Sequence, residues 1–161
     1  IDADLRKPTV HKQFKQHNGI GLTNILVQDR PIEEVVKSTP VKGLDILTSG
    51  PKPPNPSEIL GSNAMKEFIE RVKEKYDRVL IDCPPVCAVT DPALISTIVD
   101  GTILVVSAGR THIEEAKRSK QLLDNVNANI LGVVLNKIPV NSHGYYSKYY
   151  YYQYYYDDSE S

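Results

Sequence analysis

The chain has 161 residues and a formal net charge of −1 at pH 7. This length suffices for one domain with a sizeable core, and the charge excludes the strongly basic field of a protein that binds nucleic acid or a membrane surface. Two cysteines are too few for a disulfide framework and favour a reducing, cytosolic setting. Neither a signal-peptide pattern nor an apolar run of roughly 20 residues is present, so we expect any membrane contact to go through a partner.

Charged side chains are concentrated at the start of the chain, which begins with Ile1 rather than Met. Residues 1–4 read like the end of a strand whose beginning is absent, and we interpret the chain as a fragment. Four charges lie within six positions before the first proline: Asp2, Asp4, Arg6 and Lys7. Such a cluster directly after a strand end is suited to a catalytic loop, and a solvated turn is the alternative.

The segment up to residue 56 is predicted to contain short elements. Helices are expected over residues 11–15 and over 32–37, the second with a proline at its start. Residues 44–48 alternate apolar and polar side chains, which predicts a strand. Four prolines within residues 50–56 exclude regular structure there and predict an extended loop.

A longer amphipathic helix is predicted to follow a short one that begins at residue 57. Asn63 has the side chain of an N-cap and stands directly before the periodic segment. Five apolar side chains recur at helical spacing and are expected to face the core: Met65, Phe68, Ile69, Val72 and Tyr76.

Residues 79–85 carry the most informative pattern of the chain. Residues 79–81 form an apolar run typical of a strand that is buried on both faces of a parallel sheet. The run ends at Asp82, and the two prolines that follow stop the strand. Ligands of open α/β sheets bind outside the carboxyl ends of the strands, so Asp82 is a candidate ligand of a nucleotide or metal ion. An acid that only caps the following turn is the alternative.

Helices and strands continue to alternate after Asp82. The alternation predicts an α/β fold with a parallel sheet and right-handed crossovers. The predicted elements are a helix over 91–98, a buried strand over 101–106, a helix from a capping box at 111–114 to about 126, and a strand over 130–135.

The carboxy-terminal residues 141–161 differ in composition from residues 1–140, which we treat as one domain. The tract has no periodicity that could place one face in a core, so we expect a flexible tail. Clustered phenols beside acids are candidate phosphate acceptors, and an aggregation-prone or partner-binding tail is the alternative. Nine of the ten tyrosines lie here: Tyr145, Tyr146, Tyr149, Tyr150, Tyr151, Tyr152, Tyr154, Tyr155 and Tyr156.

Together these motifs resemble one family. Residues 1–8 resemble the Walker A′ motif of the bacterial protein-tyrosine kinases (BY-kinases) that govern capsule and exopolysaccharide export, and residues 80–85 resemble their Walker B motif. Residues 49–58 resemble a loop of the same group, and the tyrosine cluster completes a match over the whole chain. The resemblance implies a P-loop NTPase-like parallel sheet flanked by helices. The Walker B pattern alone would fit any deviant-Walker ATPase, whereas the tail distinguishes the kinases.

One motif of that family is missing from the 161 residues. The sequence contains no Gly-x-x-x-x-Gly-Lys-Ser/Thr, the loop that supplies phosphate-binding N–H groups, a lysine and a magnesium-binding hydroxyl. Family members carry it shortly before the Walker A′ motif. We therefore expect the loop and the first strand in an absent amino-terminal portion, and we expect the fragment itself to be inactive.

The resemblance implies phosphoryl transfer from ATP to a tyrosine hydroxyl, with Mg²⁺ as cofactor. Asp82 would hold the magnesium ion through water, with help from Asp4. Asp2 is favoured as the base that accepts the phenol proton, although the sequence leaves the division of labour between Asp2 and Asp4 open. Arg6 would bind phosphate or orient the acids, or be an ordinary surface arginine. Asn136 would contact the adenine ring or simply form a turn.

The resemblance also implies partners. A membrane adaptor would activate the kinase and hold this cytoplasmic protein at the inner face of the plasma membrane. Unphosphorylated subunits would form a ring in which each tail enters a neighbouring site, and a tyrosine phosphatase would reverse the modification; no nucleic acid is expected. Two other functions stay open: an interaction module with an incomplete nucleotide site, and a deviant-Walker ATPase without kinase activity.

Overall fold

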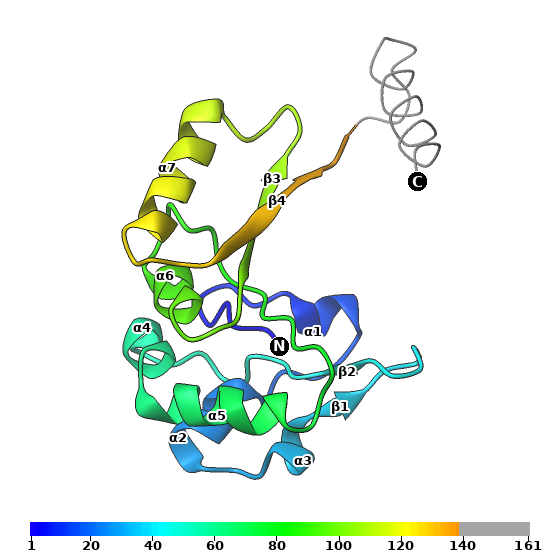
Figure 1. The fold of residues 1–161 in the computed structure, drawn as a ribbon. Coiled ribbons are helices and arrows are strands. Elements are labelled where there is room, and N and C mark those ends of the chain that lie inside the picture. The colour runs from blue at the N-terminus through cyan, green and yellow to red at the C-terminus, as the bar shows by residue number, and fades with distance from the viewer. Residues whose placement is uncertain (139–161) are drawn as a thin grey trace, which may run out of the picture.

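The computed structural model describes residues 1–138 (Figure 1). The tyrosine cluster and the predicted boundary at residue 140 lie outside the described residues. Helices α2 to α5 gather at one end of the molecule and β3, β4 and α7 at the other. The elements are α1 (Val10–Gln13), α2 (Leu22–Gln28), α3 (Ile32–Val35), β1 (Lys37–Ser38), β2 (Asp45–Ile46), α4 (Pro56–Leu60), α5 (Asn63–Lys73), α6 (Asp91–Ser96), β3 (Thr102–Ser107), α7 (Ile113–Asp124) and β4 (Ile130–Asn136).

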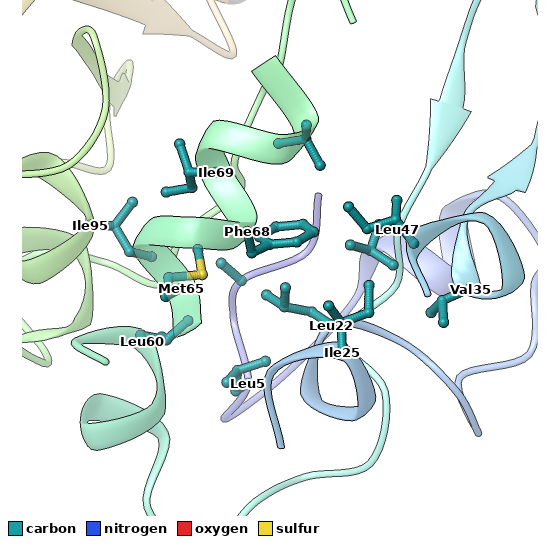
Figure 2. Close-up of a cluster of buried hydrophobic side chains, with 13 residues drawn as sticks. Leu5, Leu22, Ile25, Val35, Leu47, Leu60, Met65, Phe68, Ile69 and Ile95 are labelled. Atoms are coloured by element: carbon teal, nitrogen blue, oxygen red, sulfur yellow. The ribbon is translucent and has the colours of Figure 1, made fainter. Parts of the chain in front are cut away.

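The hydrophobic core surrounds α5 (Figure 2). Four of the five predicted side chains are 0–3% exposed, which confirms the core face: Met65, Phe68, Ile69 and Val72. The fifth, Tyr76, follows the end of the helix and is only partly buried. Ala3 and Leu5 belong to the same core. The core therefore fixes the backbone between the charged residues at the start of the chain.

Two predicted helix caps are wrong in detail. The N-cap of α5 is Ser62, whose Oγ accepts a hydrogen bond from the Met65 N–H at 3.3 Å, and Asn63 is already the first helical residue. The predicted capping box before α7 is absent, because the N-cap His112 makes no side-chain bond to the helix. The Thr111 hydroxyl instead accepts a hydrogen bond from the last residue of β3. At α5 the neighbouring Ser62 is the cap, and at α7 the Thr111 hydroxyl is bonded to β3 and not to the helix.

Parallel strand pairing is present in two places. Strands β3 and β4 pair in parallel from Thr102 opposite Ile130 to Ser107 opposite Asn136, and α7 connects them. This β–α–β unit confirms the predicted α/β class. The second parallel contact is a single bridge between Asp2 and Asp82.

The predicted strand at residues 44–48 is shorter and pairs differently. Only β2 is formed there, and it pairs antiparallel with β1. The backbone beyond β2 serves other segments: the Leu47 carbonyl accepts a hydrogen bond from the Asp2 N–H, and the Thr48 carbonyl accepts one from the start of α2. Leu47 therefore supports the amino-terminal segment and Thr48 supports the start of α2, and neither residue extends the hairpin.

The strand predicted at residues 101–106 is confirmed as β3, but its predicted burial is wrong, and the prediction of a strand buried on both faces at residues 79–81 is wrong for the described residues. Residues 79–81 are not in a strand: the Leu80 carbonyl accepts a hydrogen bond from the Ile1 amino group at 2.8 Å, the parallel bridge is at Asp82, and the Leu80 side chain is 78% exposed. Residues 1–3 pair with one side of this segment, while its other side lines an open groove of about 640 Å³ that reaches β3. Ile103 and Val105 of β3 are exposed as well. The apolar pattern of these two segments is typical of buried strands, but nothing within residues 1–138 covers the side chains that line the groove.

Candidate functional site

The backbone brings the predicted acidic residues together. The Asp82 N–H donates to the Ile1 carbonyl and the Ala3 N–H donates to the Asp82 carbonyl, both at 2.8 Å. This pairing places the strand end that carries Asp2 and Asp4 beside the strand end that carries Asp82. Acids at adjacent carboxyl ends of parallel segments occupy the usual ligand-binding edge of an α/β sheet.

Asp2 is completely buried and holds the loop that follows it. Its carboxylate accepts hydrogen bonds from the backbone N–H groups of Asp4 (3.2 Å), Thr9 (3.2 Å) and Val10 (3.0 Å). Thr9 is the N-cap of α1 but makes no side-chain cap bond, so Asp2 caps this helix from outside it. Burial raises the pKa of Asp2, while the three N–H donors act in the opposite direction.

Asp4 is partly exposed, and only one of its two carboxylate oxygens accepts hydrogen bonds within the described residues. Its Oδ1 atom accepts hydrogen bonds from the backbone N–H groups of Arg6 at 3.1 Å and Lys7 at 2.9 Å. Within residues 1–138 no hydrogen bond reaches its Oδ2 atom. The turn therefore orients the Asp4 carboxylate and leaves one oxygen available to a ligand.

Asp82 is the exposed member of the cluster. Partial desolvation raises its pKa, and repulsion by the Asp2 and Asp4 carboxylates raises it further. The three acids are thus close enough to interact electrostatically. A bound cation would relieve this repulsion, because an opposite charge stabilises the ionised form of a carboxylate.

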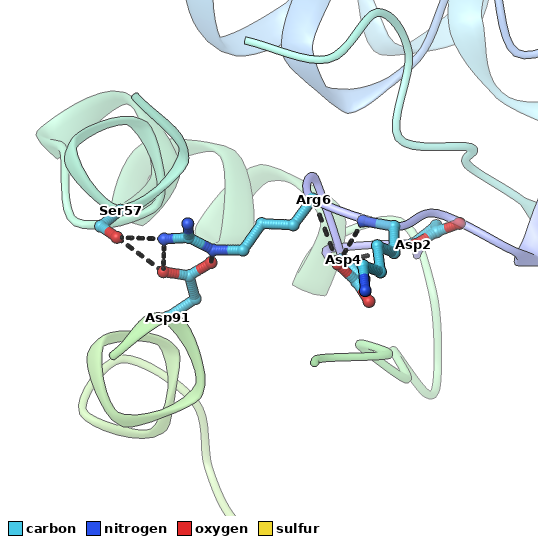
Figure 3. Close-up of polar contacts among 6 residues, drawn as sticks. Asp2, Asp4, Arg6, Ser57 and Asp91 are labelled. Carbon is cyan, nitrogen blue, oxygen red and sulfur yellow. Dashed lines mark hydrogen bonds and ion pairs between the residues drawn. The ribbon is translucent and has the colours of Figure 1, made fainter. Parts of the chain in front are cut away.

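Arg6 points away from this cluster into an ion-pair network (Figure 3). Its guanidinium donates from Nε and Nη2 to the two carboxylate oxygens of Asp91, at 2.8 and 2.9 Å, and from Nη2 to the Ser57 hydroxyl at 2.8 Å. Ser57 in turn donates to Asp91 at 2.7 Å. The Arg6 hydrogen bond lowers the pKa of the buried Asp91. Sequence reasoning assigned Asp91 only to a helix start, and no spacing pattern pointed to its pairing with Arg6.

Asn136 is not joined to the acidic cluster. It ends β4, is exposed, and accepts hydrogen bonds from the Ala108 N–H at its carbonyl (2.8 Å) and from the Lys137 N–H at its side-chain oxygen (2.7 Å). Its predicted contact with an adenine ring stays a prediction.

Within residues 1–138 no group of three or more His, Cys, Asp or Glu side chains is arranged so that it could hold a metal ion by itself. Cys83 and Cys87 are both free, and burial raises the pKa of Cys83 to about 12. A thiol with so high a pKa is neither a good nucleophile nor a good metal ligand near neutral pH. No helix in this part of the chain is long and apolar enough to cross a membrane.

Comparisons with known proteins identify the family of the chain. A family model described as an AAA domain matches residues 1–131. The chain is 42% identical over 149 residues to the tyrosine-protein kinase YwqD of Bacillus subtilis (strain 168), covering 92% of this chain and 63% of that protein. It is 39% identical over 149 residues to the putative tyrosine-protein kinase CapB of Staphylococcus aureus, covering 92% of this chain and 65% of that protein. The chain thus spans just under two thirds of these relatives.

Solved structures give the same result. The chimerical protein CapA2B2 superposes with a TM-score of 0.82 at 40% identity, covering 86% of this chain and 61% of that one. The kinase domain of the Escherichia coli tyrosine kinase ETK superposes with a TM-score of 0.79 at 34% identity, covering 89% of this chain and 58% of that one. The chain therefore belongs to the AAA domain family and, within it, to the bacterial tyrosine-protein kinases.

Proposed function

We propose that the protein transfers the terminal phosphoryl group of ATP to tyrosine hydroxyls, including those of its own residues 145–156. The observation that carries this proposal is the backbone pairing that sets Asp2 and Asp4 beside Asp82. Phosphoryl transfer needs mainly positioning and charge neutralisation, and carboxylates near a magnesium ion serve both. The kinase names of the relatives and the tyrosine-rich tail support the choice of acceptor.

Asp4 and Asp82 fit a magnesium ion, because each offers an accessible carboxylate and together they concentrate negative charge. Mg²⁺ commonly binds one or two carboxylates and completes its shell with water and substrate phosphates. When bound, it would neutralise charge on the phosphates of ATP. The predicted roles of Asp82 and Asp4 as metal ligands are therefore retained in the proposal.

The choice of base is the finer part of the proposal. The family resemblance favoured Asp2, but its carboxylate is buried and already accepts hydrogen bonds from three N–H groups. Asp4 keeps one oxygen without a partner in the described residues, and the proposal gives that oxygen to Mg²⁺, so the same oxygen does not also accept the phenol proton. This geometry favours Asp2 as the residue that shapes the loop, and the proposal assigns no base between Asp2 and Asp4. A carboxylate is an adequate base where the phosphoryl transition state is loose.

Phosphate binding would need residues from outside this sequence, since the 161 residues contain no glycine-rich Gly-x-x-x-x-Gly-Lys-Ser/Thr loop. The open groove between residues 79–83 and β3 has the apolar lining of an unfilled strand position. We propose that a strand of the same protein fills it and leads into that loop. Residues 1–161 alone would then be inactive.

The proposal extends to regulation and place. Phosphorylated tail tyrosines would each add about −1.5 to −2 charges and repel neighbouring subunits, which would open a ring of unphosphorylated copies. A membrane adaptor would activate the kinase at the inner face of the plasma membrane. A tyrosine phosphatase would remove the phosphates from the tail. The process controlled would be the export of capsule or exopolysaccharide. The solved chimerical relative CapA2B2 is compatible with a second component.

The test uses the native full-length protein with ATP and Mg²⁺, read by an anti-phosphotyrosine blot. The variant Asp82→Asn should lose labelling, and the matched control Asp77→Asn, at an exposed acid before the same strand segment, should keep it. Retained labelling in Asp82→Asn would remove Asp82 from the catalytic set.

The missing phosphate loop favours a second candidate, an interaction module whose tail is phosphorylated by another kinase. The coding sequence upstream of Ile1 distinguishes the two. A Gly-x-x-x-x-Gly-Lys-Ser/Thr motif within about 30 residues upstream, the length of a βαβ unit, supports the kinase. A start codon directly before Ile1 supports the module.

A further inference from the structure

The network of Arg6, Ser57 and Asp91 joins three segments, of which one carries Asp2 and Asp4 and another follows the loop after Asp82. Arg6 belongs to the turn that holds Asp4, and Asp91 begins α6, which follows the loop from Asp82. Ser57 lies in the first turn of α4, after the proline-rich loop. The network is therefore a direct connection between the Asp4 turn and the segment that follows Asp82.

Both the side chain and the backbone N–H of Arg6 make hydrogen bonds, and the backbone bond orients the Asp4 carboxylate. Its side chain is fixed by three hydrogen bonds to Asp91 and Ser57, while its backbone N–H donates to Asp4 Oδ1 at 3.1 Å. A shift of the Arg6 side chain would move this backbone donor. The Asp4 carboxylate, which the donor orients, would move with it.

The chain also connects Asp91 to Asp82 directly. The loop between Asp82 and α6 contains Pro84, which is buried, and Pro85, and α6 itself has Pro92 in its first turn. Prolines fix the backbone φ angle and reduce the ways in which the loop can bend. These prolines restrict the backbone on both sides of the loop that joins Asp82 to Asp91.

The Arg6–Asp91 pair differs from the other ion pairs of the described residues. Asp91 is fully buried, whereas both partners are exposed in the remaining pairs, such as Lys73–Asp100. A bidentate contact with arginine also fixes direction as well as distance. These properties suit a positioning device better than a surface contact.

We propose that Asp91 and Ser57 are positioning residues of the phosphoryl-transfer site and that, through Arg6, they fix Asp4 relative to Asp82. This inference rests on the kinase function proposed above. Both residues act through Arg6 and not on substrate. Their loss should weaken the joint hold of Asp4 and Asp82 on Mg²⁺ and slow phosphoryl transfer, because small displacements of positioned groups cost large factors in rate.

The experiment compares the native full-length protein with Asp91→Asn, Ser57→Ala and the matched control Asp100→Asn, which removes the carboxylate of an exposed pair. The rate of tyrosine phosphorylation at saturating ATP is measured against Mg²⁺ concentration and expressed per folded molecule, from circular dichroism. We expect Asp91→Asn to lose on the order of 100-fold in rate and to need more Mg²⁺ for its half-maximal rate. Ser57→Ala should lose roughly five-fold, as expected for one uncharged hydroxyl that accepts one hydrogen bond and donates another, and Asp100→Asn should behave as wild type.

A merely structural role would reduce the folded fraction without changing the Mg²⁺ requirement of the molecules that fold. A wild-type Mg²⁺ requirement in both variants would overturn the proposal and leave the kinase function intact. If Asp91→Asn does not fold, Ser57→Ala decides, since it removes a single hydroxyl. Absence of tyrosine phosphorylation in the wild-type protein would instead refute the kinase function and the positioning role with it.

Discussion

Apolar side chains are buried at one end of the molecule and exposed to solvent at the other. Around α5 the apolar side chains are buried, with Phe68 at 0% exposure, whereas along residues 79–81 and β3 Leu80 and Val105 face the groove at 78% and 58%. The acidic cluster lies where the two regions meet. The difference indicates that the core around α5 is enough to fix the backbone of residues 1–5. The apolar side chains along the groove would be buried only by a further segment that residues 1–138 do not contain.

The largest expected effect concerns the core. Phe68→Ala should lower the free energy of unfolding of residues 1–161 by about 3–5 kcal/mol, through lost burial and the cavity left behind. The control Val105→Ala, on the groove side, should cost less than about 1 kcal/mol. Urea denaturation followed by circular dichroism measures both. Equal losses at the two positions would contradict the contrast between the regions.

The Arg6–Asp91 pair should give a smaller, pH-dependent effect. Because Arg6 lowers the pKa of Asp91, the pair stabilises the fold above the ordinary carboxyl pKa of about 4, and this contribution is lost as the pH falls through the lowered pKa. Asp91→Asn should therefore destabilise most near pH 7 and least in acid. Thermal unfolding across pH tests this, and a difference that is the same at every pH would count against an ionic contribution.

The cap of α5 allows a test at neighbouring residues. Ser62→Ala should cost about 1 kcal/mol, because it removes the acceptor for the Met65 N–H. Asn63→Ala should cost close to nothing, since its side chain is not the cap. Urea denaturation of the two variants measures this, and the reverse order would restore the cap that the sequence predicted.

The smallest expected effect is a stabilisation. Desolvation and the neighbouring acids raise the pKa of Asp82, so its ionised form weakens the fold once the pH exceeds the ordinary value of about 4. Asp82→Asn should raise the midpoint of thermal unfolding slightly at pH 7, and the difference should vanish in acid. A lower midpoint at pH 7 would show that Asp82 supports the fold instead of serving a ligand.

The sequence predicted what depends on local pattern. Helical spacing identified the buried face of α5, and the strand-end position of Asp82 identified the edge where the acids meet. Burial of residues 79–81 on both faces was wrong: Val79 and Ile81 pack partly against the core, whereas Leu80 is exposed, because a strand pattern does not say whether a neighbouring strand is present. The Arg6–Asp91 contact could not be predicted either, since it joins residues 85 positions apart through the tertiary fold.

The most direct test of the kinase proposal mixes two variants of the native full-length protein. One carries Asp82→Asn and an intact tail; the other keeps Asp82 but has phenylalanine at all nine tail tyrosines. With ATP and Mg²⁺, phosphate incorporation into each chain is measured by mass spectrometry. We expect no tail phosphate on Asp82→Asn alone and clear incorporation when the two are mixed. Incorporation into Asp82→Asn alone, or none in the mixture while wild type is labelled, would contradict transfer from an Asp82-centred site to a neighbouring tail.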